Sequence, residues 1–319
     1  MLPNVQRTDA ADHVPVLAEE VRELLDVQPG ETVVDATFGA GGHSRILAAE
    51  LQGTGKLVAI DRDPTVKGYF DRVKASTRGV QMRFLRGNYA VVLSQLAAND
   101  VRADAVLLDL GLSSMQVDRP ERGFSYATDA RLDMRMDTSE EMSAADVVAT
   151  YDERELASIF KRYGEERYAR QIARSIVRRR DESPIERTGQ LVDIVKASIP
   201  APARFGEGHP AKRVFQALRI EVNHELEALE AGLPAAFEML RPGGRLAVIS
   251  FHSLEDRIVK QFLRDRARGC TCPPELPICV CGKEPEARIV TPKPLRPSAV
   301  EIDHNPRASS ARLRVAVRV

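Results

Sequence analysis

Three glycines fall within four residues, Gly39, Gly41 and Gly42, directly after an apolar run that begins at Val33. A simple turn needs one glycine, whereas several glycines between a strand and a helix let a ligand approach the backbone closely. The spacing is G-x-G-G and differs from the G-x-G-x-x-G pattern of pyrophosphate-binding turns. It therefore favours a ligand without a phosphate group.

Two acidic residues end other apolar runs. Asp61 ends "LVAID", about 20 residues after the glycines, where an acidic side chain can accept both hydroxyls of a ribose. Asp109 ends "AVLLD". Acidic side chains beside a glycine turn suit an adenosyl ligand with a positive centre, and S-adenosylmethionine is such a ligand. The alternative is that the glycines serve tight packing and the acids are solvated strand ends.

The elements that must position these residues alternate along the first third of the chain. Apolar strands are predicted at 31–38, 56–61, 80–87 and 103–110, with helical segments between them. Near-continuous apolar strands separated by helices form parallel sheets that are covered on both faces. The sequence therefore predicts a Rossmann-like α/β fold with a mostly parallel sheet.

This alternation stops after the fourth strand. Helical stretches and polar loops fill 114–223, and an apolar strand returns at 243–251. The last residues, 311–319, alternate as a half-exposed edge strand does. We therefore expect one α/β domain, made of 1–113 and 224–319, that is interrupted by a helical domain. The insertion follows the carboxyl edge of the sheet, where open α/β sheets bind ligands.

Composition limits the possible partners. The 319 residues are 43% hydrophobic and 29% charged, as is usual for a soluble globular protein. Lys and Arg together number 46, as do Asp and Glu, so a nucleic-acid surface must be a local patch. No apolar run approaches the roughly 18 residues of a membrane-spanning helix, and the first residues do not resemble a signal peptide. The sequence thus predicts a cytoplasmic protein without a membrane segment.

Longer strings resemble one family. They include "DATFGAGGHS", "LLDLGLSS", "YGEERYARQIARSIV", "FQALRIEVNHEL" and "PGGRLAVISFHSLEDRIVK", and the resemblance runs from His13 to the end of the chain. The chain resembles the RsmH (MraW) family of small-subunit ribosomal RNA cytosine-N4 methyltransferases. This resemblance implies a class I methyltransferase fold with an inserted helical substrate-recognition domain and S-adenosylmethionine as cofactor. It implies N4-methylation of a specific cytidine near the decoding centre of the small subunit, with 16S ribosomal RNA or the assembled subunit as partner.

The resemblance also implies roles for individual residues of the cofactor pocket. Gly41, Gly42 and His43 would line the methionine side. Asp61 would hold the ribose, and Tyr89 would pack on the adenine. Asp109 and Gln116 would complete the pocket. Tyr89 stands where phenylalanine is more familiar in the family, and it preserves the flat face.

The proposed reaction sets demands on the catalytic residues. The exocyclic amine of cytosine is a poor nucleophile, so the enzyme must hold it in line with the sulfonium methyl at roughly 3 Å. It must also accept hydrogen bonds from the amine as positive charge develops. Asp109 is the candidate catalytic acceptor, although a role in cofactor binding alone is equally consistent with its position. Phe124 and Tyr126 could stack on the base or could belong to the core.

Two further motifs have two interpretations each. His252, in "SFHSLEDR", could orient the base or shuttle a proton. Ser253, followed by Glu255 and Asp256, instead favours ordinary N-capping of the helix that follows. The segment "RYARQIARSIVRRR" forms either a phosphate-binding or a plainly solvated helical face, which would carry Arg170, Arg174 and Arg178. The tail adds further basic residues to a possible RNA footprint, namely Arg307, Arg312 and Arg314.

All four cysteines lie in "CTCPPELPICVC", as Cys270, Cys272, Cys279 and Cys281. Two C-x-C pairs could form a tetrahedral thiolate site, but zinc knuckles usually have C-x-x-C spacing, and no histidine accompanies the cysteines. Disulfides are not expected in a reducing cytoplasm. The sequence therefore leads us to predict no metal, with zinc as the alternative.

Two other functions compete with methylation of ribosomal RNA. The protein could methylate an amine in DNA, or it could be a non-catalytic RNA-binding assembly factor with a vestigial cofactor fold. The intact glycines, Asp61 and Asp109 argue against the second. The choice of RNA over DNA rests on the resemblance, because no residue pattern here reads a 2′-hydroxyl group.

Overall fold

The computed structural model describes residues 15–204, 208–270, 272 and 281–319. Their strands form one seven-stranded sheet in the order β3-β2-β1-β4-β5-β7-β6. Five strands are parallel: β1 (Thr32–Asp35), β2 (Lys56–Asp61), β3 (Gln81–Arg86), β4 (Ala103–Asp109) and β5 (Leu240–Ser250). β7 (Arg312–Arg318) runs antiparallel to both β5 and β6 (Ala287–Ile289). The predicted α/β fold with a mostly parallel sheet is confirmed.

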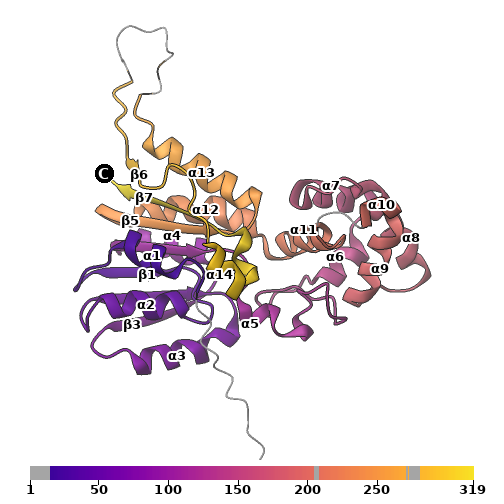
Figure 1. The fold of residues 1–319 in the computed structure, drawn as a ribbon, viewed down its shortest axis with the longest axis horizontal. Coiled ribbons are helices and arrows are strands. Elements are labelled where there is room, and N and C mark those ends of the chain that lie inside the picture. Colours follow the sequence, from indigo (N-terminus) through magenta and orange to yellow (C-terminus); the bar gives the residue numbers. More distant parts are fainter. Residues whose placement is uncertain (1–14, 205–207, 271, 273–280) are drawn as a thin grey trace, which may run out of the picture.

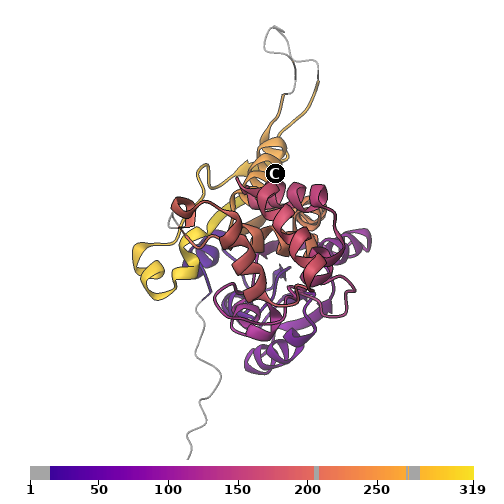
Figure 2. The ribbon, with the colours of Figure 1, turned by 90° about the vertical axis from the view of Figure 1, so that its right-hand side faces the viewer.

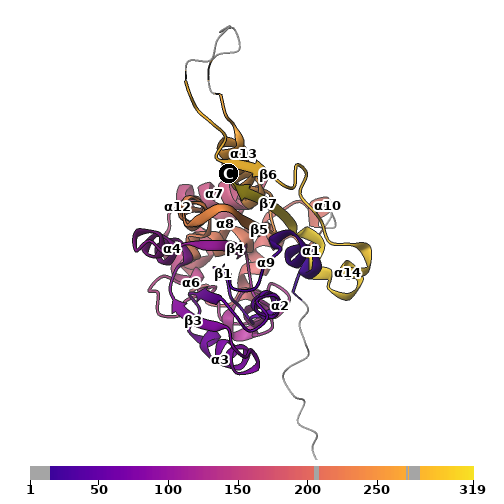
Figure 3. The ribbon, with the colours of Figure 1, turned by 90° about the vertical axis from the view of Figure 1, so that its left-hand side faces the viewer.

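Helices cover both faces of the sheet (Figure 3). The helices α1 (Ala18–Leu25), α2 (Gly42–Glu50) and α3 (Lys67–Ser76) contribute to one core, and α4 (Tyr89–Ala98), α12 (Glu225–Glu238) and α13 (Ser253–Ala267) to the other. Successive strand residues point to opposite faces, so Val33 packs in the first core and Val34 in the second. This double burial explains why the strands are apolar without alternation.

A helical part lies beside the sheet (Figures 1 and 2). Its helices are α6 (Ala144–Thr150), α7 (Glu153–Gly164), α8 (Ala169–Glu182), α9 (Thr188–Ser198), α10 (Ala201–Arg204) and α11 (Lys212–Asn223). Short helical turns, α5 (Ser114–Val117) and η2 (Pro120–Arg122), connect β4 to it. Its buried residues, from Phe124 to Leu226, form a third core that is separate from the two cores of the sheet.

The prediction that the last strand is a sheet edge is wrong. β7 lies between β5 and β6, where Leu313 and Val315 are fully buried and Arg314 is only 7% exposed. The edge strand β6 has three residues, too few to give a periodic pattern in the sequence. Between β6 and β7, α14 (Ala299–His304) and the helical turn η3 (Pro306–Ser310) return the chain toward the carboxyl ends of the parallel strands.

Side-chain caps fix where several helices begin. The Asn88 side chain accepts a hydrogen bond from the N–H of Ala90 and so starts α4, and Asp152 and Glu155 form a capping box at α7. The turn η1 (Pro64–Val66) is capped by Asp63 in the same way. Within the described ranges, none of the helices combines the length and the apolar character needed to cross a membrane.

Candidate active site

A cavity of about 210 Å³ opens at the carboxyl ends of β1, β2 and β4. The strand order reverses direction between β1 and β4, and such switch points are where open α/β sheets bind ligands. Six of the seven predicted cofactor residues line the cavity: Gly42, His43, Asp61, Tyr89, Asp109 and Gln116. Gly41, the seventh, is not among the lining residues.

The glycines of the turn after β1 are needed for two different physical reasons. Gly39 has a positive φ and donates its N–H to Oδ2 of Asp61 at 2.7 Å. At Gly41 the φ is 79°, and a Cβ atom would lie 2.5 Å from Cζ of Phe38. Gly41 therefore serves the packing of Phe38, whereas Gly39 and Gly42 leave their backbone open to the cavity.

Asp61 holds its carboxylate at the cavity wall through two backbone groups. The N–H of Gly39 donates to Oδ2 and the N–H of Asp63 donates to Oδ1, at 2.7 and 2.9 Å. Burial raises the pKa of Asp61 to about 6 although both hydrogen bonds favour the ionised form. Because a carboxylate offers about four lone-pair sites, two remain for the hydroxyls of a ribose.

Tyr89 reaches the cavity at the start of α4. A Cβ atom at Gly232 of α12 would lie 2.6 Å from Cε2 of Tyr89, so the missing side chain makes room for the ring. Burial raises the pKa of the Tyr89 phenol, which therefore stays neutral. A flat neutral ring at the wall is the kind of surface on which a purine base packs.

Gln116 lines the cavity, but its amide is engaged within the protein. Its Nε2 donates to Oδ2 of Asp63 at 3.1 Å and its Oε1 accepts from the N–H of Ser113 at 3.2 Å. The side chain is 5% exposed. Gln116 therefore shapes the wall and fixes the turn after β4.

Asp63, which the sequence analysis did not select, joins the cavity wall to the helical part. Its buried carboxylate accepts from Thr65, from Gln116 and from Nη1 of Arg122 at 2.9 Å. Burial alone would raise its pKa, but these hydrogen bonds and the Arg122 charge outweigh burial and hold the pKa below its usual value. Arg122 also donates to the carbonyl groups of Arg135 and Met136. Asp63 is thus connected, through Arg122, to backbone up to 14 residues beyond Arg122 in the sequence.

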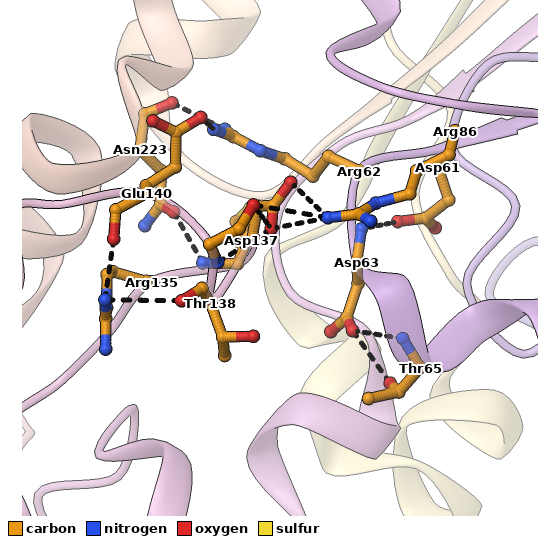
Figure 4. Close-up of polar contacts among 12 residues, drawn as sticks. Asp61, Arg62, Asp63, Thr65, Arg86, Arg135, Asp137, Thr138, Glu140 and Asn223 are labelled. Carbon is orange, nitrogen blue, oxygen red and sulfur yellow. Dashed lines mark hydrogen bonds and ion pairs between the residues drawn. The ribbon is translucent and has the colours of Figure 1, made fainter.

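A second set of contacts runs beside the first (Figure 4). Nη1 of Arg62 donates to the carbonyl oxygen of Asn223 at 2.7 Å, and the Asn223 amide bonds to Met134 and Met136, both at 2.7 Å. Arg86, which ends β3, pairs with Asp137 at 3.0 Å. The loop around 134–140 is thus held against the strand ends that form the cavity.

Asp109 presents an oxygen atom without a partner. Its N–H donates to Oγ1 of Thr37 at 2.6 Å, and Nε2 of His43 lies 3.5 Å from its Oδ2. Its Oδ1 is buried and has no hydrogen-bond partner among the described residues. An unpaired buried carboxylate oxygen is costly, so the site fits a ligand that brings an N–H group or a positive charge. S-adenosylmethionine carries both.

A second cavity, of about 470 Å³, adjoins the first. Leu112 and Phe251 line both cavities. The second is also lined by three aromatic rings and four cationic side chains: Phe124, Tyr126, Phe215, Lys212, Arg219, Arg296 and Arg312. Aromatic faces flanked by cations are suited to a nucleotide.

The aromatic pair Phe124 and Tyr126 packs on the core of the helical part, which confirms one interpretation, and stacking on the base stays a prediction. Phe124 is 8% exposed and belongs to the core of the helical part, yet both rings line the second cavity. Tyr126 stacks on His209, with ring centroids 4.5 Å apart, and meets Phe215 edge-on. The rings are therefore held in place by the core while they face the cavity.

The predicted cap at the start of α13 is present, but the capping residue is His252 and not Ser253, which is the first residue of the helix. Nδ1 of His252 accepts from the N–H of Glu255, and Nε2 lies 3.2 Å from Oε1 of Glu255. Burial alone would raise the pKa of Glu255, but the charges of His252 and Arg219 keep it below the usual value. The imidazole also lines the second cavity.

The basic residues of the tail do not form one RNA surface. Arg314 is buried and pairs with Asp256 at 2.6 Å, so its expected part in an RNA footprint is wrong. Arg312 pairs with the same carboxylate, and Arg307 pairs with Asp118 and lines the first cavity. The sequence pattern could not show these pairs because their partners lie 56 to 189 residues away.

The arginines of α8 are exposed as predicted, but they lie far from both cavities. α8 is at the end of the helical part away from the sheet (Figure 1), and it exposes Arg170, Arg174 and Arg178. Arg174 lies 3.5 Å from Glu153 of α7. Whether this face contacts RNA stays a prediction.

Comparison with known proteins decides the family. A family model described as "MraW methylase family" matches residues 10–319. The chain belongs to this family. As an MraW methylase it is a methyltransferase, and its cofactor is S-adenosylmethionine.

Relatives of this MraW methylase share one name. "Ribosomal RNA small subunit methyltransferase H" of Heliobacterium modesticaldum is 50% identical over 310 residues, which cover 96% of this chain and 98% of that protein. The protein of the same name from Symbiobacterium thermophilum is 51% identical over 314 residues, 97% of this chain and 98% of that one. Among solved structures, an rRNA methylase from Streptococcus thermophilus is similar at 10% identity and a TM-score of 0.40, over 97% of this chain and 99% of that chain.

Proposed function

We propose that this methyltransferase transfers a methyl group to N4 of a specific cytidine in 16S ribosomal RNA, near the decoding centre, in the cytoplasm. The unpartnered Oδ1 of Asp109 carries the proposal, because it offers an acceptor for an amine beside the cofactor cavity. The relatives named for methylation of small-subunit ribosomal RNA support the choice of substrate.

At the first cavity, the seven residues expected to bind the cofactor divide the work. Asp61 accepts the ribose hydroxyls, Tyr89 packs on the adenine, and Gly42 and His43 border the methionine part. Gln116 fixes the wall, and Gly41 supports the turn from below through Phe38. The bound cofactor supplies a methyl group on a positively charged sulfur, and the residues around it hold and orient that group.

Asp109 has the catalytic role in this proposal. Its Oδ1 accepts a hydrogen bond from the N4 amine and fixes the direction of the nitrogen lone pair. Since the amine becomes positive as the new bond forms, a nearby carboxylate stabilises the transition state more than the ground state. Thr37 holds the backbone N–H of Asp109, and His43 lies beside the carboxylate.

The second cavity receives the target nucleotide. Phe124 and Tyr126 offer ring faces to the base, and Lys212 and Arg296 have no ion-pair partner within the described ranges, so they are available to phosphate. Residues 114–223 supply most of the aromatic wall, while 1–113 and 224–319 supply most of the cofactor site. We therefore assign substrate recognition to the inserted segment.

The variant Asp109→Asn tests the role of Asp109. Turnover should fall by about 100-fold, because the charge that stabilises the transition state is lost, while cofactor affinity changes far less. Asp100→Asn, a change of the same kind at a side chain 89% exposed on the surface, is the matched control. Equal losses of turnover and cofactor affinity in Asp109→Asn would restrict Asp109 to cofactor binding.

The substrate is tested by transfer of a tritiated methyl group to small subunits, free 16S RNA and DNA in parallel, followed by nucleoside analysis. We expect label as N4-methylcytidine in the ribosomal RNA samples. Label in DNA alone would point to the DNA alternative. No transfer to any sample, with cofactor bound, would support the non-catalytic assembly factor.

A further inference from the structure

Three cysteines come together where the chain leaves α13 and returns to β6. The Sγ atoms of Cys270, Cys272 and Cys281 all lie within 4.8 Å of one another. Cys270 and Cys281 are exposed and Cys272 is partly exposed. Cys279 lies outside the described residues. Cysteines that meet for packing reasons are normally buried, so the exposure of this group calls for another cause.

The sulfur spacing fits shared coordination of one ion. Sγ of Cys270 and Sγ of Cys281 are 3.8 Å apart. A disulfide would bring them to about 2.05 Å. Two thiolates on a tetrahedral zinc ion, each at about 2.3 Å, lie about 3.8 Å apart. The observed separation excludes a disulfide; it matches two ligands on one metal and equally an S–H···S contact, so the metal itself has to be measured.

The cysteines lie on two arms of chain, residues 266–270 at the end of α13 and residues 281–286 before β6. Contacts between the arms hold them side by side. The N–H of Glu286 donates to the carbonyl oxygen of Arg266 at 2.8 Å, and the side chains of the same two residues form an ion pair. A Cβ atom at Gly269 would lie 3.1 Å from Cδ of Pro285, so the arms approach closely just before the cysteines. This frame is built from residues on both arms and does not depend on the sulfur atoms.

The backbone beside the cysteines is arranged as it is around metal-bound sulfur. The N–H of Cys272 donates to Sγ of Cys270 at 3.4 Å, as backbone groups do around metal-bound sulfur. Gly282, directly after Cys281, has a φ of 58°, a turn conformation that suits glycine. Nε of Arg268 donates to the carbonyl oxygen of Cys270 at 3.3 Å, and Nζ of Lys283 donates to that of Asp265 at 3.4 Å, so both side chains tie down the backbone beside the cysteines.

We propose that Cys270, Cys272 and Cys281 bind one Zn²⁺ ion as thiolates and so join the end of α13 to the start of β6. Zinc is the metal that tetrahedral thiolate sites select among common divalent ions. The sequence led us to expect no metal because the C-x-C spacing is unusual. In the structure, Cys270 and Cys281 come together although they are 11 residues apart in sequence, so the C-x-C spacing does not determine which cysteines meet.

A second group of possible ligands is a weaker candidate. Atoms of Glu225, His252 and Glu255 also lie within 4.8 Å of one another. However, Arg219 donates to both carboxylate oxygens of Glu225, at 2.7 and 2.8 Å, and Oε2 of Glu255 accepts from the N–H of Phe251. These acceptors are already engaged within the protein. A substitution in this group therefore serves as the control in the test of the cysteine site.

The test measures metal content in protein purified without a histidine tag. Elemental analysis should give about one zinc per chain in the native protein. In the double variant Cys270→Ser/Cys281→Ser the zinc content should fall to near zero, whereas His252→Ala should retain it. Native protein that neither contains zinc nor binds one equivalent when it is added would overturn the proposal, as would full zinc content in the double variant or loss of zinc in His252→Ala.

Two measurements on the native chain keep the test decisive if the double variant does not fold. Thiol modification with a mercurial should release zinc in step with thiol loss. Cobalt added to the metal-free protein should give thiolate-to-cobalt absorption in the near ultraviolet, together with the visible bands of a tetrahedral ion. Zinc release without thiol loss, or cobalt bands of an octahedral oxygen site, would contradict the assignment. None of these readouts depends on methyl transfer.

Discussion

The raised pKa of Asp61 makes cofactor binding depend on pH in a predictable direction. Ribose hydroxyls donate to a carboxylate, so the cofactor binds the ionised form of Asp61. Burial raises the pKa of this group to about 6 in the empty cavity. Above pH 6 the carboxylate is ready for the ligand, and below it a proton must first leave. Affinity should therefore be constant at neutral pH and decline as the pH falls through 6.

The size of the effect follows from the fraction of Asp61 that is ionised. With a pKa of about 6, that fraction is about 97% at pH 7.5 and about 9% at pH 5.0, so the dissociation constant should rise about tenfold between them. Calorimetric titration of S-adenosylmethionine or its demethylated product across this range measures it directly. Circular dichroism at each pH checks that the protein remains folded.

The control for this prediction is Asp61→Asn. Its amide does not titrate, so the pH dependence due to residue 61 should vanish, while affinity at pH 7.5 falls by about 1–3 kcal/mol. A flat profile in the native protein, or an identical slope in Asp61→Asn, would refute the assignment of Asp61 as the ribose acceptor.

Three other changes have defined outcomes. Gly232→Ala should displace the Tyr89 ring and weaken cofactor binding about tenfold by calorimetry, whereas Gly68→Ala, at an exposed helical position with no atom within 4 Å of the new Cβ, should not. Replacing Arg170, Arg174 and Arg178 with Gln should lower RNA affinity and its salt dependence without changing the methylated position. If filter binding shows no change, the phosphate contacts belong to Lys212 and Arg296, and the α8 face is simply solvated. Arg314→Gln should lower the free energy of unfolding by about 3 kcal/mol, because Asp256 loses its buried partner, and more than Arg312→Gln does in the same denaturant titration.

The strands and helices of the α/β part could be predicted from the sequence because local pattern determines them. The segment 56–61 is β2 as expected, and Asn88 starts α4 as its type suggests. The edge of the sheet could not be predicted in this way. β6 has three residues, and its place beside β7 depends on pairing with residues 316–318, far away in the sequence.

The site was predictable where a residue type has a direct chemical meaning. Acidic residues at strand ends identified Asp61 and Asp109, and both line the first cavity. Asp63 and Asn223 were missed because their importance lies in partners 59 and 87 residues away in sequence. Gly41 shows the converse, since its glycine is explained by the Phe38 ring beneath it.

Through the contact between Arg62 and Asn223, α11 reaches from the wall of the first cavity to the wall of the second. Arg62 lines the first cavity, and its guanidinium donates to the last residue of α11. The first residue of α11, Lys212, lines the second cavity, about 18 Å away along the helix. A shift of Arg62 on cofactor binding would therefore act on the helix whose other end carries Lys212. Thermodynamic linkage then requires reciprocity: the factor by which cofactor changes the affinity for RNA equals the factor by which RNA changes the affinity for cofactor.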